Sequence, residues 1–205
     1  MYKVYPKIIL ACLLLVMTGT VYSQRVTQTI NDGWKFSLFE GDASTADFDI
    51  SGWTDVSIPH TWNAKDADDE ISGYFRGKGW YRKVVAVEEL IPEQRVYLSF
   101  EGANQETNVF VNGTFVGNHK GGYSAFTFDV TDYVHAGRNL IAVSVDNSHN
   151  PDIAPLSADF TFFGGIYRDV YLVYTSPVHC LLLITLLVGC ISKHRRLRIC
   201  KQIFQ

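Results

Sequence analysis

The chain has 205 residues, of which 47% are apolar and 14% aromatic, and its formal net charge at pH 7 is −3. This length fits one ordinary domain with short appendages, and the apolar content excludes wholesale disorder. The charge is unevenly distributed, because residues 24–177 hold all 21 acidic residues against 11 basic ones, a net charge of −10. A nucleic-acid partner is therefore excluded, since phosphate binding needs a cationic surface.

The first 23 residues have the pattern of a secretory signal peptide. Two lysines precede an apolar run over residues 8–17, and Val21 and Ser23 occupy the −3 and −1 positions of a cut before Gln24. The run is shorter than the roughly 20 residues of a membrane-spanning helix, which favours cleavage over anchoring. We therefore expect residues 1–23 to be removed and the protein to be exported, to the periplasm or the cell exterior.

Residues 24–177 are predicted to form one all-β domain. Short runs rich in Val, Phe, Tyr and Ile recur between turn residues, which is typical of strands. The clearest predicted strands are 80–87, 95–100, 108–111, 114–117, 125–130, 140–145 and 169–174. Asn112 and Gly113 give the strongest hairpin signal, because both residues tolerate a positive φ. No helix of ten or more residues is predicted, so the pattern favours a β-sandwich or jelly roll.

Eight segments of this domain carry a resemblance to a known family. They are 31–36 (NDGWKF), 56–62 (VSIPHTW), 79–83 (GWYRK), 100–102 (FEG), 108–113 (NVFVNG), 117–130 (GNHKGGYSAFTFDV), 146–147 (DN) and 163–170 (FGGIYRDV). In this order and spacing they resemble the N-terminal sugar-binding domain of glycoside hydrolase family 2, which includes β-galactosidases, β-glucuronidases and β-mannosidases. The resemblance covers residues 24–177 and implies a jelly-roll β-sandwich of the galactose-binding-domain type.

The resemblance also implies what the parent protein does. In this family the domain packs against an immunoglobulin-like domain and a TIM barrel, and the barrel carries two catalytic glutamates roughly 5–5.5 Å apart in a retaining mechanism. We expect the chain to lack both later domains, to hold no catalytic residue, and to be an inactive fragment of an enzyme that hydrolyses O-glycosyl bonds of β-galactosides or related glycosides. The alternatives are a stand-alone exported carbohydrate-binding module and a tail-anchored interaction protein.

Two residues are implied as contributors to a sugar site. Asp159 stands several residues before the GIYRD motif at 165–169, at the place of an aspartate that contacts sugar hydroxyls at the nonreducing end. A carboxylate suits this role because it accepts charge-assisted hydrogen bonds; the alternative is a solvated loop aspartate. Arg76 stands where β-galactosidases have an asparagine, and an arginine either contacts a hydroxyl, pairs with an acidic sugar, or is an exposed loop residue.

The other chemistry-bearing residues are expected to be structural. His60 follows Pro59 and is expected to pack or to hydrogen-bond a turn. The cysteines, at 12, 180, 190 and 200, contain no C-x-x-C pair, and the chain has no zinc, phosphate-loop or nucleophile motif. We therefore predict neither a metal nor a cofactor.

Residues 178–205 break with the composition of the domain. Residues 178–191 are almost wholly apolar, a basic cluster follows over 193–198, and acidic residues are absent. One interpretation is that a frameshift or truncation replaced the natural continuation, so that the tail is not native to the fold. The other is a membrane anchor, although 14 apolar residues are short for a span.

Overall fold

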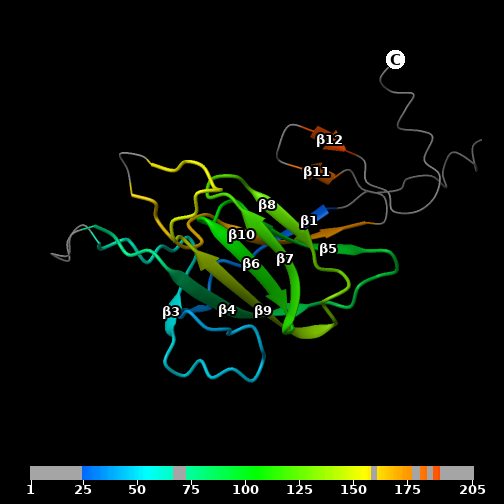
Figure 1. The fold of residues 1–205 in the computed structure, drawn as a ribbon. Helices are drawn as coiled ribbons and strands as arrows, with labels where there is room; N and C mark the ends of the chain where they lie inside the picture. Colours follow the sequence, from blue (N-terminus) through cyan, green and yellow to red (C-terminus); the bar gives the residue numbers. More distant parts are fainter. Residues whose placement is uncertain (1–24, 67–72, 158–160, 177–180, 184–186, 190–205) are drawn as a thin grey trace, which may run out of the picture.

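The chain folds into two antiparallel β-sheets that pack against each other (Figure 1). The computed structural model describes residues 25–66, 73–157, 161–176, 181–183 and 187–189. Within these ranges every regular element is a strand, and none of the described residues forms a helix long and apolar enough to cross a membrane. The prediction of a β-sandwich is confirmed.

The first sheet has four strands and the second has six. In spatial order the four-stranded sheet contains β1 (Arg25–Thr29), β10 (Val170–Thr175), β5 (Arg95–Phe100) and β8 (Phe126–Asp129). The six-stranded sheet contains β3 (Thr54–Val56), β2 (Trp34–Leu38), β4 (Lys78–Val87), β9 (Gly137–Asp146), β6 (Glu106–Val111) and β7 (Thr114–Lys120). A separate short pair joins β11 (Leu181–Leu183) to β12 (Leu187–Gly189).

All seven strands expected from sequence are present, as β4 to β10. The hairpin between β6 and β7 turns at Asn112 and Gly113, whose φ angles are 51° and 81°. This is the conformation for which an Asn-Gly pair is suited. Strands β1, β2 and β3 were not predicted; β1 is exposed along its whole length, so its sequence carries no alternation of apolar and polar residues.

The hydrophobic core lies between the two sheets. Side chains of β6 alternate between half-buried and buried, which puts Thr107, Val109 and Val111 on the inner face. The largest fully buried side chains come from both sheets and from the segment before β10; they include Trp34, Tyr81, Leu98, Phe100, Ile141, Ile166 and Leu172. Each buried Leu, Ile or Phe among them contributes about 1.5–3 kcal/mol, so this layer supplies the main stabilisation of the domain.

A long loop between β2 and β3 covers the outer face of β4. The indole Nε1 of Trp80 donates to the carbonyl of Gly41 at 3.0 Å, and the guanidinium of Arg82 donates to the carbonyl of Phe48 at 3.3 Å. The Arg82 guanidinium also lies 5.9 Å from the centre of the Phe48 ring. Strand β4 is thus packed on both faces. This packing fixes the position of the segment that leads into β4 and ends at Gly77.

Candidate functional site

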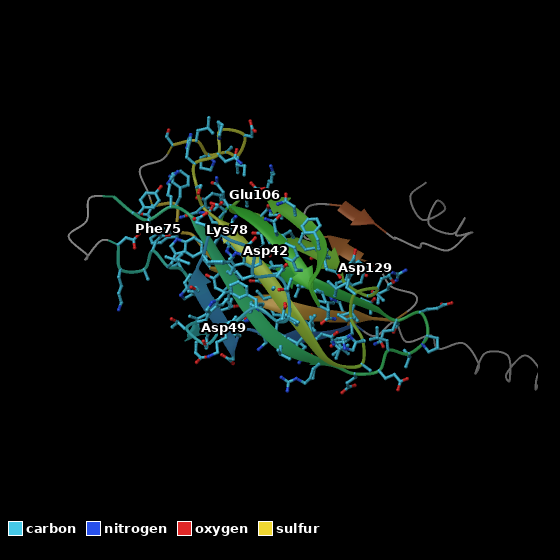
Figure 2. All side chains as sticks on the ribbon, turned by 60° about the horizontal axis from the view of Figure 1, so that its bottom comes forward. Asp42, Asp49, Phe75, Lys78, Glu106 and Asp129 are labelled. Atoms are coloured by element: carbon cyan, nitrogen blue, oxygen red, sulfur yellow. The ribbon has the colours of Figure 1, made fainter. Side chains whose placement is uncertain are left out.

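One end of the sandwich gathers the loops that precede β4, β6 and β10. In the strand register, Lys78 at the start of β4 stands opposite Asp146 at the end of β9. Asp146 in turn stands opposite Glu106 at the start of β6. Antiparallel pairing therefore brings these strand ends to one edge. Figure 2 shows Phe75, Lys78 and Glu106 at this end and Asp129 toward the other. We call this edge the loop end.

Asn147, directly after β9, connects the loops of this end. Its side chain is buried, with 1% of its surface exposed. The Oδ1 atom accepts from the backbone N–H of Gly77 at 2.9 Å. The Nδ2 atom donates to the carbonyls of Phe162 at 3.0 Å and Phe75 at 3.3 Å, and to Oδ1 of Asn63 at 3.3 Å. One amide thus joins two segments that are far apart in sequence, the one between β3 and β4 and the one between β9 and β10.

Asn63 extends this network. Its Oδ1 accepts from the backbone N–H of Gly164 at 2.6 Å, and its Nδ2 donates to Oδ2 of Asp66 at 2.7 Å. The same Asp66 oxygen accepts from the backbone N–H of Phe75 at 2.8 Å. A buried network in which the amide groups hydrogen-bond each other and the backbone makes its loops rigid. The segments on either side of Arg76 are therefore held in place.

Arg76 projects from the segment just before β4. Its guanidinium carbon lies 4.9 Å from the centre of the Tyr74 ring and 4.9 Å from the centre of the Phe162 ring. Its Nε donates to the Tyr74 hydroxyl at 3.0 Å, and one terminal nitrogen donates to the same oxygen. Among the described residues it has no carboxylate partner. Arg76 is therefore a cation oriented by two aromatic rings.

An aromatic cleft of about 160 Å³ lies at the same end. Its lining residues are Asn104, Tyr123, Thr161, Phe163 and Tyr167. Tyr123 and Phe163 are 45% and 46% exposed, so their rings are accessible from solvent. Burial raises the pKa of Tyr123 and of Tyr167 above the usual value for a phenol, which leaves both hydroxyls protonated at neutral pH. The surface of the cleft is almost wholly apolar and aromatic, and the C–H face of a sugar ring can pack on such a surface.

Asn104 holds the floor of this cleft. Its Nδ2 donates to the carbonyl of Phe163 at 2.9 Å, and its backbone N–H donates to the carbonyl of Gly165 at 3.0 Å. Its Oδ1 has no hydrogen-bond partner among the described residues and lies against Gly122, where a β-carbon would come within 2.2 Å. The hydroxyl of Tyr167 donates to the Gly122 carbonyl. This bond joins the segment between β9 and β10 to the loop between β7 and β8.

The residues singled out from sequence have different outcomes. Arg76 lies at the loop end, beside Phe162, and the role expected for it stays a prediction. Asp159 lies outside the described residues, although Thr161, two positions later in sequence, lines the cleft. His60 is bonded through Nδ1 to the Tyr81 hydroxyl at 2.8 Å and packs on Phe36, in line with a structural role. The described residues contain no group of three or more potential metal ligands.

Sequence reasoning missed the aromatic cleft. Tyr123 follows the Gly121–Gly122 turn, and Tyr167 lies within the GIYRD motif, but the two are 44 positions apart and nothing local indicates that they meet. The signal available was the presence of aromatic residues in loops, where binding residues concentrate. Phe163 is nearly half exposed, which is what makes its ring accessible in the cleft.

Comparisons with known proteins point to one family. The sequence model of "Glycosyl hydrolases family 2, sugar binding domain" matches residues 27–177. The chain is 38% identical over 166 residues to a β-glucuronidase of Bacteroides fragilis, covering 79% of the chain and 22% of that protein. It is 39% identical over 158 residues to a β-galactosidase of Thermoanaerobacter pseudethanolicus, covering 75% of the chain and 20% of that protein.

Solved structures give the same result. The crystal structure of a Bacteroides uniformis β-glucuronidase matches with a TM-score of 0.72 and 45% identity, covering 78% of this chain and 19% of that one. An apo structure of a second β-glucuronidase from the same organism, β-glucuronidase 3, matches with a TM-score of 0.70 and 32% identity, covering 76% of this chain and 23% of that one. The chain therefore spans about a fifth of the length of the relatives it matches.

Proposed function

The chain belongs to the sugar-binding domains of glycosyl hydrolase family 2, and on this premise we propose that its loop end contacts the terminal sugar of a glycan substrate. Carbohydrate binding in general follows from the family. The identity of the sugar is the part we propose here, and it rests on the residues of the loop end.

The observation that carries the proposal is the environment of Arg76. Its guanidinium carbon lies 4.9 Å from the centre of the Tyr74 ring and 4.9 Å from that of the Phe162 ring, and it has no carboxylate partner among the described residues. A cation held rigidly beside a cleft favours an anionic group, and a guanidinium matches the geometry of a carboxylate. We infer that the preferred sugar is a uronic acid and that Arg76 pairs with its carboxylate.

The relatives are consistent with an acidic sugar, since several are named β-glucuronidases. Others are named β-galactosidases, so the family alone does not decide between the two. The position of Arg76 supports the uronic acid, because a neutral galactoside has no group that requires a full positive charge. Asp159 completes the proposal as an acceptor for sugar hydroxyls, a role that suits a carboxylate.

The activity of the whole parent protein is also a proposal. We propose that it hydrolyses O-glycosyl bonds, and that this domain supplies part of the sugar site while the catalytic carboxylates come from elsewhere in the parent. We further propose that the protein is exported, on the strength of the basic and apolar pattern of residues 1–23.

The test is a comparison of two small ligands on the full chain. Methyl β-D-glucuronide and methyl β-D-galactoside are titrated while amide chemical shifts are followed by NMR. An isolated part of a sugar site is shallow, so we expect dissociation constants of about millimolar or weaker. The expected result is stronger binding of the glucuronide, with shifts at Arg76, Tyr123 and Phe163.

The matched variants are Arg76→Gln and Arg138→Gln. Both remove one arginine charge, but Arg138 lies at the far end of β9, in register with Ala86 rather than at the loop end. Arg76→Gln is expected to remove the preference for the glucuronide, and Arg138→Gln is expected to keep it. Equal affinity of the unmodified chain for both sugars, or an equal effect of the two variants, would refute the assignment.

A further inference from the structure

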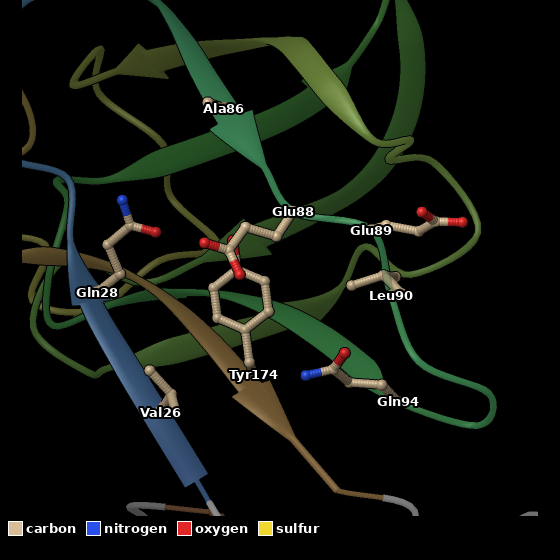
Figure 3. Close-up of a pocket in the computed structure, with 8 residues that line it drawn as sticks. All are labelled: Val26, Gln28, Ala86, Glu88, Glu89, Leu90, Gln94 and Tyr174. Atoms are coloured by element: carbon tan, nitrogen blue, oxygen red, sulfur yellow. The ribbon is translucent and has the colours of Figure 1, made fainter.

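A second pocket lies at the opposite end of the sandwich from Arg76. It has a volume of about 400 Å³ and is formed by β1, β10, the end of β4 and the segment that joins β4 to β5 (Figure 3). Its lining residues are Val26, Gln28, Ala86, Glu88, Glu89, Leu90, Gln94 and Tyr174. The volume falls within the roughly 300–1,000 Å³ usual for pockets that bind small molecules. We call it the Tyr174 pocket.

The Tyr174 pocket is separate from the loop end. Arg76 precedes the first residue of β4, and Glu88 follows its last residue. Strand β4 has 10 residues, and a strand rises about 3.3 Å per residue, so about 33 Å separate the two ends. A ligand in one place therefore does not touch the other, and changes in one pocket can be measured while the other is left intact.

Tyr174 forms the centre of the pocket. Figure 3 shows its ring between Val26 and Gln28 of β1 on one side and Leu90 and Gln94 on the other. The ring is half-buried and packs against the hydrophobic core, which holds it in one orientation. A fixed aromatic face with aliphatic neighbours gives the apolar part of a binding surface.

Polar groups surround this ring. Figure 3 shows Glu88 beside the hydroxyl end of Tyr174, and the charge of Glu88 contributes, after burial, to raising the pKa of that phenol. Gln94 accepts from the backbone N–H of Ile91 through Oε1 at 3.1 Å, which leaves its Nε2 as a donor. Gln28 adds a second amide. The pocket thus offers a charged acceptor, amide donors and a hydroxyl around an aromatic face.

The charge of the pocket selects among ligands. No Lys, Arg or His is among the residues that line it, and the ion pairs of the described residues leave both Glu88 and Glu89 without a cationic partner. A phosphate or a uronate would meet unpaired carboxylates, so anions are disfavoured. A simple cation would use the carboxylate but not the amide donors. A neutral sugar uses both, because each hydroxyl donates and accepts, while its C–H face packs on the ring.

We propose that the Tyr174 pocket is a second carbohydrate site, specific for a neutral hexopyranoside, with Glu88 and Gln94 bonding its hydroxyls and Tyr174 supporting its ring. The two ends of the domain then have opposite preferences. The loop end favours an acidic sugar at Arg76, and the Tyr174 pocket favours a neutral one. Such a pair of sites fits a glycan that contains both kinds of residue.

The experiment is an NMR titration of the full chain with methyl β-D-glucoside, methyl β-D-galactoside and methyl β-D-mannoside, each up to about 50 mM, since weak affinity is expected. Methyl β-D-glucuronide and choline serve as the anionic and cationic probes. The expected result is a shift of the amides of Gln28, Glu88 and Tyr174 with at least one neutral glycoside and none with the glucuronide. A silent pocket with all three neutral glycosides would refute the proposal, as would a response to choline alone.

One matched pair of variants and one single variant test the roles of individual side chains. Glu88→Gln and Glu89→Gln remove the same charge, but in Figure 3 the carboxylate of Glu89 points away from Tyr174. We expect Glu88→Gln to weaken binding about 10-fold, the size of one charge-assisted hydrogen bond, and Glu89→Gln to change it less than about 2-fold. Tyr174→Phe keeps the ring and the fold, and is expected to retain partial binding. Equal effects of the two glutamine variants would contradict the role of Glu88.

The Arg76→Gln variant separates this proposal from the one above. This variant is expected to leave the amide shifts that neutral glycosides cause at the Tyr174 pocket unchanged, because about 33 Å separates Arg76 from the pocket. Loss of neutral-sugar binding in that variant would overturn the independence of the two sites. Failure of the glucuronide to bind at the loop end would leave the result at the Tyr174 pocket unaffected.

Discussion

The side chains of Asn147 and Asn63 bond each other across 84 residues of sequence, with Nδ2 of Asn147 donating to Oδ1 of Asn63 at 3.3 Å. This contact joins the loop after β9 to the loop after β3. Both amides also bond the backbone of the loops that carry Arg76 and the aromatic cleft. The candidate sugar site therefore depends on a buried amide pair that itself lies beneath the site.

Replacing Asn147 by Ala is expected to destabilise the loop end. The substitution leaves the Gly77 N–H without its acceptor and removes the bonds that Nδ2 makes to Asn63 and Phe162, and an unsatisfied buried group costs about 1–3 kcal/mol. We expect the free energy of unfolding, measured by urea denaturation, to fall by about 2–4 kcal/mol. Asn118→Ala is the control, because that side chain is largely exposed on β7. A loss no greater than that of the control would contradict this account.

The sequence allowed the strands to be predicted better than the site. Alternating apolar residues fix β4 to β10, because a strand that buries one face must repeat every two residues. The Asn112–Gly113 turn was equally clear, since its positive φ angles demand those residue types. Strand β1 was missed because an exposed edge strand imposes no such pattern.

The cleft could not be predicted in the same way. Tyr123, Phe163 and Asn104 come from three loops, and their meeting depends on the register of β6 with β7 and β9 and on backbone bonds between Asn104 and Gly165. The turn fixes the register of β6 with β7, but the pairing of β6 with β9 and the bonds between Asn104 and Gly165 join segments far apart in sequence, which local sequence does not predict. Arg76 was found only because the family resemblance marks its position.

Gly165→Ala is expected to destabilise the fold strongly. Gly165 has a φ of +115°, and a β-carbon there would lie 2.6 Å from the Tyr81 hydroxyl and 2.7 Å from the carbonyl oxygen of His60. Overpacking of this kind costs about 1–3 kcal/mol, and the backbone conformation adds to it. Thermal unfolding followed by circular dichroism provides the measurement. Gly52→Ala is the matched control, because nothing lies within 4 Å of its added carbon; a similar loss for both variants would count against this explanation.

Phe163→Ala is expected to weaken sugar binding with little change in stability. The ring is 46% exposed, so its removal alters the free energy of unfolding by no more than about 1 kcal/mol. Loss of an aromatic surface from the cleft is expected to reduce the affinity for methyl β-D-glucuronide by about 3–10-fold. The control is Phe115→Ala, which removes a ring of similar exposure, 50%, from β7. Unchanged affinity in Phe163→Ala would remove the cleft from the proposed site.

The stability of the domain is expected to fall on acidification, in part because of His60. Burial lowers the pKa of His60 below its usual value of about 6.5. In the unfolded chain the imidazole protonates as the pH falls through 6.5, while in the folded chain it stays neutral to a lower pH. The unfolded state then binds more protons, so the free energy of unfolding decreases from above pH 6.5 down to the folded-state pKa and levels off below it.

Urea denaturation at pH 7.5 and pH 5.5 measures this effect. We expect His60→Gln to lower stability at pH 7.5, because the bond to the Tyr81 hydroxyl and the contact with Phe36 are lost. The same variant is expected to show a smaller decrease between the two pH values than the unmodified chain. Some decrease remains, since burial also lowers the pKa of His119. His149 is exposed, so His149→Gln is expected to keep the full decrease. If His60→Gln kept it as well, the neutral buried imidazole would not be the source of the pH dependence, and the loss would have to come from other groups.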